Sequence, residues 1–84
     1  MNINNYNIIG IIQARMGSTR FPGKMAVELG GIPIIDWVIS RSLKSKLVNK
    51  FILATSINME NDYLIGRANK YGIESFRGSE NNVL

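Results

Sequence analysis

The sequence predicts an α/β fold in which strands and helices alternate in the order β-α-β-α-β. Two short segments, residues 8–13 (apolar from 8 to 12) and residues 51–54, have the length and composition of buried strands, and residues 73–76 form a third candidate. The two longer segments between them carry apolar residues at helical spacing. Strands that alternate with helices favour a parallel sheet with right-handed crossovers, and we expect the strand order 3-2-1.

The first strand, residues 8–13, is apolar at successive positions, as a strand buried on both faces would be. The glycine pair at residues 30–31 predicts a turn, and Pro33 suits the first turn of a helix that we expect to extend to about Ser45. We interpret Trp37 on this helix as core packing. The residues expected on its apolar face are Ile34, Ile35, Val38, Ile39 and Leu43.

After the second strand, residues 51–54, Asn58 is a suitable N-cap for a second helix. Gly72 is placed to end that helix, and the third strand follows it at residues 73–76. The residues expected on the inner face of this helix are Leu64, Ala68 and Tyr71.

The predicted topology leaves part of the sheet open. Two right-handed crossovers that progress in the same direction place both helices on one face. The other face and the outer edge of the first strand then lack cover, although that strand is apolar. We therefore interpret residues 1–84 as a single partial domain, the N-terminal part of a larger one. We also expect the chain to form homo-oligomers by association through the open sheet.

The composition excludes several classes of chemistry. The chain has no cysteine and no histidine, which removes disulfides, thiolate nucleophiles, Ser-His triads and nearly all zinc sites. A metal here would be a hard cation with oxygen ligands, such as Mg²⁺. No apolar run approaches the roughly 20 residues that span a bilayer, and the N-terminus lacks the basic region of a signal peptide. We expect a cytoplasmic protein with no membrane partner.

The formal net charge of +4 is unevenly distributed. Arg15, Arg20 and Lys24 form a cluster, and no acidic residue precedes Glu28. A focused cluster favours a small anion over the extended track that nucleic acid requires. We interpret the second basic group as a solvated helix end; a nucleic-acid role is the alternative, although no aromatic residues interleave with it. That group is Lys44, Lys46 and Lys50.

The loop of residues 13–24, which follows the first strand directly, combines cations, glycines and hydroxyls. Arginine offers a planar fork to two phosphate oxygens, and lysine offers a mobile point charge. Gly17 and Gly23 allow backbone N–H groups to approach an anion closely. The hydroxyls of Ser18 and Thr19 add neutral donors. Ligands of parallel sheets bind beyond the carboxyl ends of the strands, so we expect this loop to hold phosphates.

Two common phosphate motifs are excluded by counting. Five residues separate Gly17 from Gly23, where a P-loop has four, and Met25 stands where a P-loop has serine or threonine. The dinucleotide fingerprint G-x-G-x-x-G is absent as well. The alternative interpretation, a solvated basic loop that binds no ligand, stays open at this point.

Residues 11–24, IIQARMGSTRFPGK, closely resemble the opening of cytidylyltransferases that activate sugars. The spore-coat polysaccharide type is the nearest match, and the synthetases of CMP-activated ketodeoxyoctonate and acylneuraminate are more distant. The similarity continues through residues 31–35, 37–38, 41, 54–56 and 76–80, and so covers nearly the whole chain from Ile8 onward.

The resemblance implies a Rossmann-like fold of the nucleotide-diphospho-sugar transferase type, of which this chain would be the N-terminal, nucleotide-binding part. Such enzymes join CTP to a sugar, release pyrophosphate and use Mg²⁺. Family members are much longer than this chain, and their metal-binding carboxylate and sugar site lie later in the sequence. Ligands for Mg²⁺ are therefore expected beyond residue 84, and no metal ligand is assigned within the chain.

The resemblance also implies roles for individual residues. Arg15 and Lys24 would be catalytic, with Lys24 offsetting the charge that develops on the α-phosphoryl group, and Arg77 would face the base. The nucleotide-binding residues it implies are Ala14, Arg15, Gly17, Ser18, Thr19, Arg20, Gly23, Lys24, Thr55, Ser56 and Arg77. The alternative function is a truncated, catalytically inactive module that binds a nucleotide or associates with itself.

Overall fold

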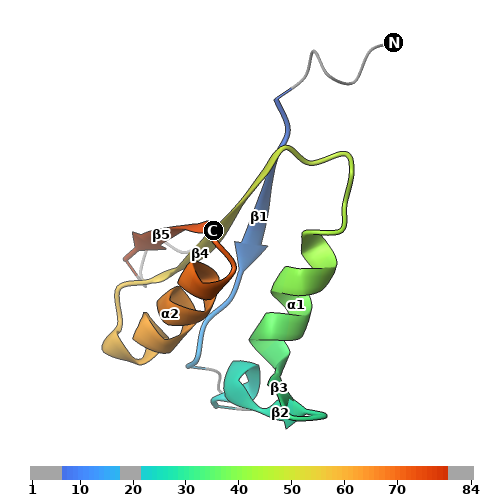
Figure 1. Cartoon of the computed structure of the whole chain (residues 1–84). Helices are drawn as coiled ribbons and strands as arrows, with labels where there is room; N and C mark the ends of the chain where they lie inside the picture. Colours follow the sequence, from blue (N-terminus) through green and yellow to red (C-terminus); the bar gives the residue numbers. More distant parts are fainter. Residues whose placement is uncertain (1–6, 18–21, 80–84) are drawn as a thin grey trace.

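Three parallel strands form the main sheet of the structure, a computed structural model that describes residues 7–17 and 22–79. The strands are β1 (Ile9–Gln13), β4 (Lys50–Ser56) and β5 (Glu74–Gly78), in the order β1-β4-β5. Helix α1 (Ile34–Ser42) lies between β1 and β4 along the chain, and α2 (Asp62–Lys70) lies between β4 and β5 (Figure 1). The parallel α/β fold that the sequence predicts is confirmed.

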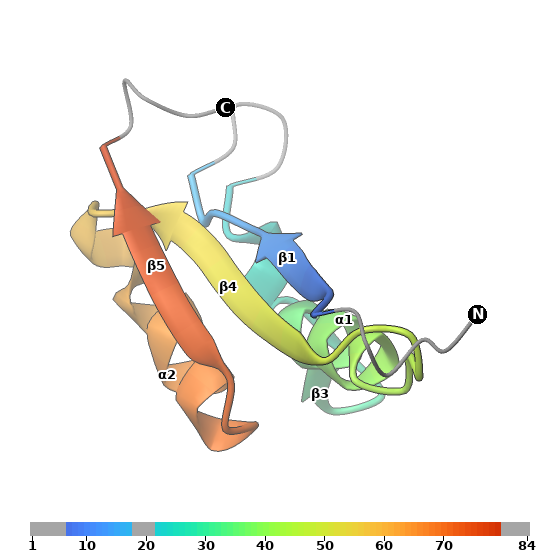
Figure 2. The ribbon, with the colours of Figure 1, turned by 90° about the horizontal axis from the view of Figure 1, so that it is seen from above.

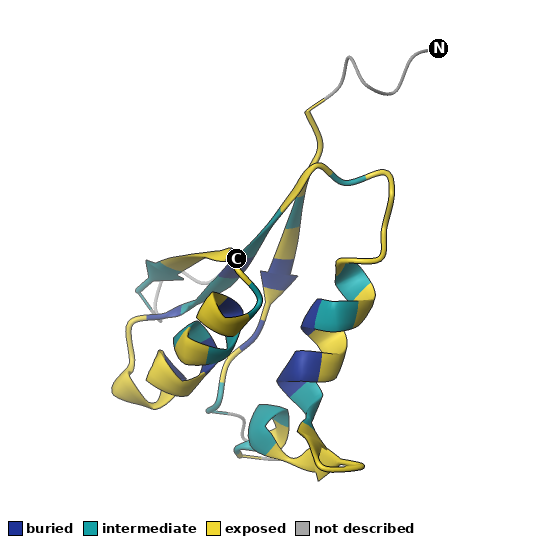
Figure 3. Cartoon of the chain, viewed as in Figure 1, coloured by how far each residue is buried: buried dark blue, intermediate teal, exposed yellow. Residues whose placement is uncertain are grey.

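Both helices lie on one face of the sheet (Figure 2), as two successive right-handed crossovers require. The side chains that meet between helices and sheet form the core, and Figure 3 shows the buried positions on this side. Helix α1 is shorter than expected, and Val38 and Leu43 of its predicted apolar face are exposed. The buried apolar residues of the core are Ile12, Ala14, Ile35, Ile39, Leu53, Leu64, Ala68 and Ile73.

The opposite face of the sheet carries exposed apolar side chains. Ile11 on β1 is 62% exposed and Phe76 on β5 is 65% exposed. Ile11 lies in register with Ile52 of β4, and Phe76 lies in register with Ala54, so apolar residues extend across the sheet. Within the described residues, β1 is an edge strand covered on one face only. This agrees with the expectation that one face of the sheet and the outer edge of the first strand lack cover within these residues.

A short hairpin, absent from the sequence prediction, precedes α1. Strands β2 (Glu28–Leu29) and β3 (Ile32–Pro33) pair in antiparallel fashion across the glycine pair. Gly30 and Gly31 have φ angles of 63° and 82°, as a two-residue type I′ turn demands. Trp37 donates its indole N–H to the Leu29 carbonyl at 3.0 Å and is exposed, so it braces the hairpin rather than packing in the core.

Helix α2 begins and ends with distinct local structures. A 3₁₀ turn, η3 (Met59–Asn61), separates Asn58 from the helix, and the Asn58 side chain makes no capping hydrogen bond. At the other end, the Gly72 N–H donates to the Asn69 carbonyl at 3.0 Å and the Ile73 N–H donates to the Ala68 carbonyl at 3.1 Å. These two bonds form a Schellman motif, so the predicted stop at Gly72 is confirmed.

The two helices are joined by a buried carboxylate that the sequence analysis did not single out. Asp36 on α1 is only 1% exposed and accepts hydrogen bonds from Arg67 of α2 and from Tyr71 at its end. Each carboxylate oxygen has at least one donor, so the buried charge is paired.

No helix in the described part of the chain is long and apolar enough to span a membrane.

Candidate functional site

The carboxyl ends of the three parallel strands meet at one edge of the sheet, where the arrowheads lie together in Figure 2. Ala14 extends β1 by one further bond, since its N–H donates to the Ala54 carbonyl at 3.1 Å. On the neighbouring strands, Thr55 of β4 lies in register with Arg77 of β5. The fold thus brings predicted residues from three distant parts of the sequence to the same edge.

The loop after β1 is closed by a backbone hydrogen bond. The Gly23 N–H donates to the Met16 carbonyl at 2.9 Å, and the 3₁₀ turn η2 (Lys24–Ala26) begins directly afterwards. Arg15 precedes Met16 and Lys24 follows Gly23, so each cation is next in sequence to one end of this bond, and both are exposed. Two cations at the mouth of one closed loop suit an anion. Three predicted residues of this loop, Ser18, Thr19 and Arg20, lie outside the described residues.

Gly17 lies against an acidic side chain that the sequence analysis did not connect with the loop. A Cβ atom at Gly17 would stand 2.6 Å from Oε1 of Glu60, a residue of η3. A side chain at Gly17 would displace that carboxylate, which is the end of an exposed and flexible side chain. The turn after β4 thus packs against the start of the loop.

Ser56, at the end of β4, is 4% exposed and faces inward. Its Oγ accepts from Nδ2 of Asn61 at 2.6 Å and from the Asn58 N–H at 3.3 Å. The carboxamide Oδ1 of Asn61 in turn accepts from the Met16 N–H at 2.7 Å. Asn61 is fully buried and was missed by the sequence analysis, since its partner Met16 is 45 residues away and no local pattern signals it. The neighbouring Thr55 Oγ1 is buried with no partner among the described residues.

Arg77 donates through three of its nitrogen atoms to the segment that follows β4. Nε bonds the Ser56 carbonyl at 3.0 Å, Nη2 bonds the Asn58 carbonyl at 2.8 Å, and Nη1 pairs with Asp62 at 2.7 Å. The guanidinium therefore braces the β4–α2 connection. Its expected contact with a base stays a prediction.

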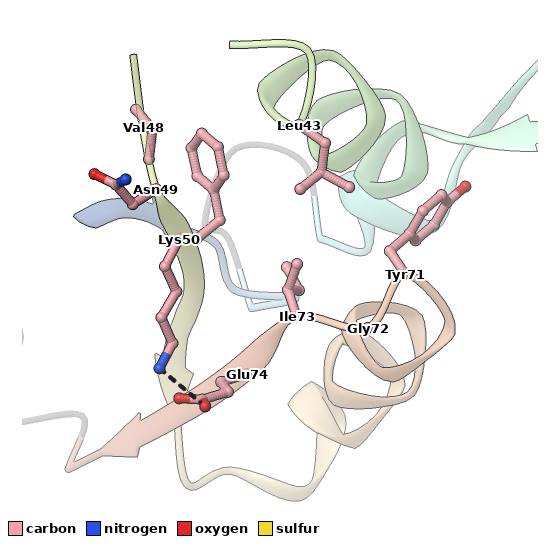
Figure 4. Close-up of a pocket in the computed structure, with 9 residues that line it drawn as sticks. Leu43, Val48, Asn49, Lys50, Tyr71, Gly72, Ile73 and Glu74 are labelled. Carbon is pink, nitrogen blue, oxygen red and sulfur yellow. Dashed lines mark ion pairs between the residues drawn. The ribbon is translucent and has the colours of Figure 1, made fainter. Parts of the chain in front are cut away.

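A separate pocket of about 340 Å³ lies at the opposite end of β4 and β5, beside the C-terminal ends of both helices (Figure 4). Leu43, Tyr71 and Ile73 line it, and Lys50 pairs with Glu74 at 3.0 Å along one side. It shares no residue with the predicted phosphate loop.

Among the described residues no group of three or more acidic side chains could hold a metal ion. The described part of the site therefore contributes the two exposed cations Arg15 and Lys24, and its described residues hold no such acidic group.

A sequence model described as Cytidylyltransferase matches residues 9–84. The chain belongs to this cytidylyltransferase family. The Bacillus subtilis spore coat polysaccharide biosynthesis protein SpsF is 42% identical over 82 residues, which cover 93% of this chain and 34% of that protein. The resemblance predicted from residues 11–24 is thus confirmed at the level of the family.

Solved structures of cytidylyltransferases share the fold. A cytidylyltransferase from Leptospira borgpetersenii superposes with a TM-score of 0.81 at 38% identity, over 92% of this chain and 33% of that one. A CMP:2-keto-3-deoxy-manno-octonic acid synthetase, solved in complex with CTP, gives a TM-score of 0.68 at 27% identity, over 87% of this chain and 28% of that one. Their Rossmann-like fold is therefore the fold of this chain. The chain spans about a third of the length of the relatives it matches.

Proposed function

We propose that this cytidylyltransferase chain is the N-terminal nucleotide-binding part of an enzyme that joins CTP to a sugar and releases pyrophosphate. The observation that carries the proposal is the closed loop after β1, which presents Arg15 and Lys24 at the carboxyl edge of a parallel sheet. The family match supports a cytidine nucleotide, and the relative solved with CTP supports the triphosphate. A role in polysaccharide biosynthesis is supported by the spore coat relative.

The chemistry of nucleotidyl transfer suits a site without histidine. Such a reaction needs positioned reactants and neutralised phosphate charge more than it needs acid–base catalysis. In this proposal the guanidinium of Arg15 and the ammonium of Lys24 hold the phosphates, and Lys24 stabilises the charge that develops at the α-phosphorus. Ala14, Gly17, Gly23, Thr55, Ser56 and Arg77 complete the nucleotide site, together with Ser18, Thr19 and Arg20 of the same loop.

Mg²⁺ belongs to the proposal as the partner of CTP. When bound, it would neutralise part of the negative charge of the phosphates. We propose that its protein ligands lie beyond residue 84, as the resemblance to the family implies; the described residues hold no acidic group that could bind a metal ion. A cytoplasmic location, expected from the sequence, stays a prediction.

Calorimetry tests the proposal directly. CTP, UTP and ATP are titrated in turn into the 84-residue chain in the presence of Mg²⁺. Saturable binding of CTP that is tighter than binding of UTP and ATP is the expected result. Equal binding of all three nucleotides would reduce the function to general phosphate binding, and no binding at millimolar nucleotide would refute a nucleotide site in this chain.

A second candidate function, self-association, is favoured by the exposed face of the sheet. Ile9, Ile11 and Phe76 are 47%, 62% and 65% exposed on a face that no described element covers. Burying such side chains contributes about 25 cal/mol per Å² of apolar surface, which is a driving force for two copies to meet. Sedimentation of the wild-type chain and of Ile11→Thr/Phe76→Thr tests this candidate. The wild type should form dimers or larger species and the double variant should shift to monomer, whereas a wild-type monomer at all concentrations would exclude it.

A further inference from the structure

We propose that Asn61 is a positioning residue that sets the path of the phosphate loop for nucleotide binding, an inference that rests on the proposed function. Asn61 is fully buried in η3, between β4 and α2. Its carboxamide accepts from the Met16 N–H at 2.7 Å and donates to Ser56 Oγ at 2.6 Å. One side chain therefore connects the start of the loop with the end of the central strand.

The contact between Asn61 and Met16 lies just beyond the last hydrogen bond that joins β1 to the sheet. The last ladder bond of β1 is the one from the Ala14 N–H to the Ala54 carbonyl. Beyond it, the Met16 N–H has the Asn61 carboxamide as its acceptor. The carbonyl of Met16 accepts from the Gly23 N–H, and this bond closes the loop immediately before Lys24. Asn61 thus holds Met16, the residue whose carbonyl closes the loop by accepting from Gly23.

The orientation of the carboxamide is determined by its neighbours. A backbone N–H can only donate, so Met16 requires the oxygen of Asn61 on its side. The Asn58 N–H likewise donates to Ser56 Oγ at 3.3 Å, which leaves that oxygen as the acceptor for Nδ2 of Asn61. The Ser56 hydroxyl, which the sequence analysis assigned to the nucleotide, thus accepts from Nδ2 and holds the Asn61 carboxamide in this orientation.

Three substitutions separate the positioning role from simple packing. Asn61→Asp keeps an acceptor for Met16, and the Ser56 hydroxyl can turn its proton toward the new carboxylate. Asn61→Leu keeps the number and branching of the side-chain heavy atoms and leaves the Met16 N–H without a partner. Asp36→Asn serves as the matched control, because it weakens a buried polar network that does not touch the loop.

Two measurements on the whole chain are needed. Calorimetry gives the affinity for CTP with Mg²⁺, and nuclear magnetic resonance gives the hydrogen exchange rate of the Met16 amide without nucleotide. In Asn61→Leu we expect CTP affinity to fall about tenfold or more and Met16 exchange to accelerate, since an unpaired buried donor is costly. We expect Asn61→Asp to keep slow Met16 exchange and to lose less CTP affinity than Asn61→Leu, because its carboxylate still accepts from the Met16 N–H. Asp36→Asn should match wild type in affinity while melting earlier.

The outcomes distinguish the inference from the proposed function. Wild-type affinity in a folded Asn61→Leu variant, or a loss no larger than that of Asp36→Asn, would overturn the positioning role. If Asn61→Leu does not fold, the smaller Asn61→Ala replaces it, and an unchanged CTP affinity there overturns the role in the same way. If the wild type binds no CTP, the proposed function fails, and Met16 exchange decides the inference alone: unchanged protection in Asn61→Leu refutes it.

Discussion

The guanidinium of Arg67 on α2 donates to both carboxylate oxygens of Asp36 on α1, with Nε 2.8 Å from Oδ1. The hydroxyl of Tyr71 adds a third donor at 2.9 Å. This network is a polar connection between the two helices that cover the sheet. It also fixes how α1 and the hairpin before it lie relative to α2. The turn η3 directly precedes α2, and its Glu60 side chain lies against Gly17 of the phosphate loop.

Asp36→Asn should lower the free energy of unfolding by about 1–3 kcal/mol, because Arg67 and Tyr71 lose a charged acceptor in a buried position. Urea denaturation followed by circular dichroism measures the change. Glu74→Gln is the matched control, since it breaks the exposed pair with Lys50, in which the side chains are 65% and 47% exposed. We expect that control to cost less than about 1 kcal/mol, and equal costs for the two variants would contradict the role of Asp36.

The same network predicts how stability depends on pH. The hydrogen bond from Arg67 lowers the pKa of Asp36, although burial opposes it, and the Tyr71 hydroxyl adds to the lowering. The folded state therefore gains stability above the unfolded carboxyl pKa of about 3.9, and loses it as the pH falls through the lower folded pKa. Urea midpoints measured from neutral to acid pH should converge for wild type and Asp36→Asn below about pH 4. Parallel curves over that range would show that Asp36 is not the titrating group.

Two glycines outside the site should respond to alanine with opposite signs. A Cβ atom at Gly10 would lie 2.6 Å from Cδ1 of the Phe51 ring, which packs against the core, whereas a Cβ at Gly66 in α2 meets no atom within 4 Å. Gly10→Ala should therefore destabilise the chain by about 1–3 kcal/mol through overpacking. Gly66→Ala should stabilise it by about 0.5–1 kcal/mol through helix propensity. Melting temperatures that move in the same direction would disprove this reading of the two positions.

Much of this fold follows from local patterns. The strand at residues 51–54 and the stop at Gly72 were predictable, because an apolar run and a glycine after a helical stripe act over short distances. The hairpin was not predictable beyond its Gly30-Gly31 turn, since its two strands have only two residues each. Exposure of Ile11 could be inferred only from topology, because residues 8–12 around it are all apolar.

Less of the site than of the fold could be predicted from the sequence. The loop of residues 13–24 was visible because its cations and glycines are contiguous. Asn61 was not, because its carboxamide acts on Met16, 45 residues earlier. Asp36 carried a weak signal as the single charge in the first two turns of an apolar helix, and only its contacts with Arg67 and Tyr71 explain it.

Arg77→Lys separates two roles of one residue. A lysine cannot donate at once to the Ser56 and Asn58 carbonyls and to Asp62, so the free energy of unfolding should fall by about 1–2 kcal/mol. If Arg77 also faces the base, the preference for CTP over UTP should fall in the same variant. Calorimetry with both nucleotides measures this, and an unchanged preference would leave Arg77 with the bracing role alone.

The central claim is that Arg15 and Lys24 hold the phosphates of CTP, and calorimetry of Lys24→Ala with CTP and Mg²⁺ tests it most directly. Lys46→Ala is the control, since Lys46 is also an exposed lysine and lies outside the loop. The account predicts that Lys24→Ala weakens CTP binding about tenfold or more without changing the melting temperature, because a charged phosphate contact is lost from an exposed position. Equal CTP affinity in Lys24→Ala, Lys46→Ala and the wild type would contradict it.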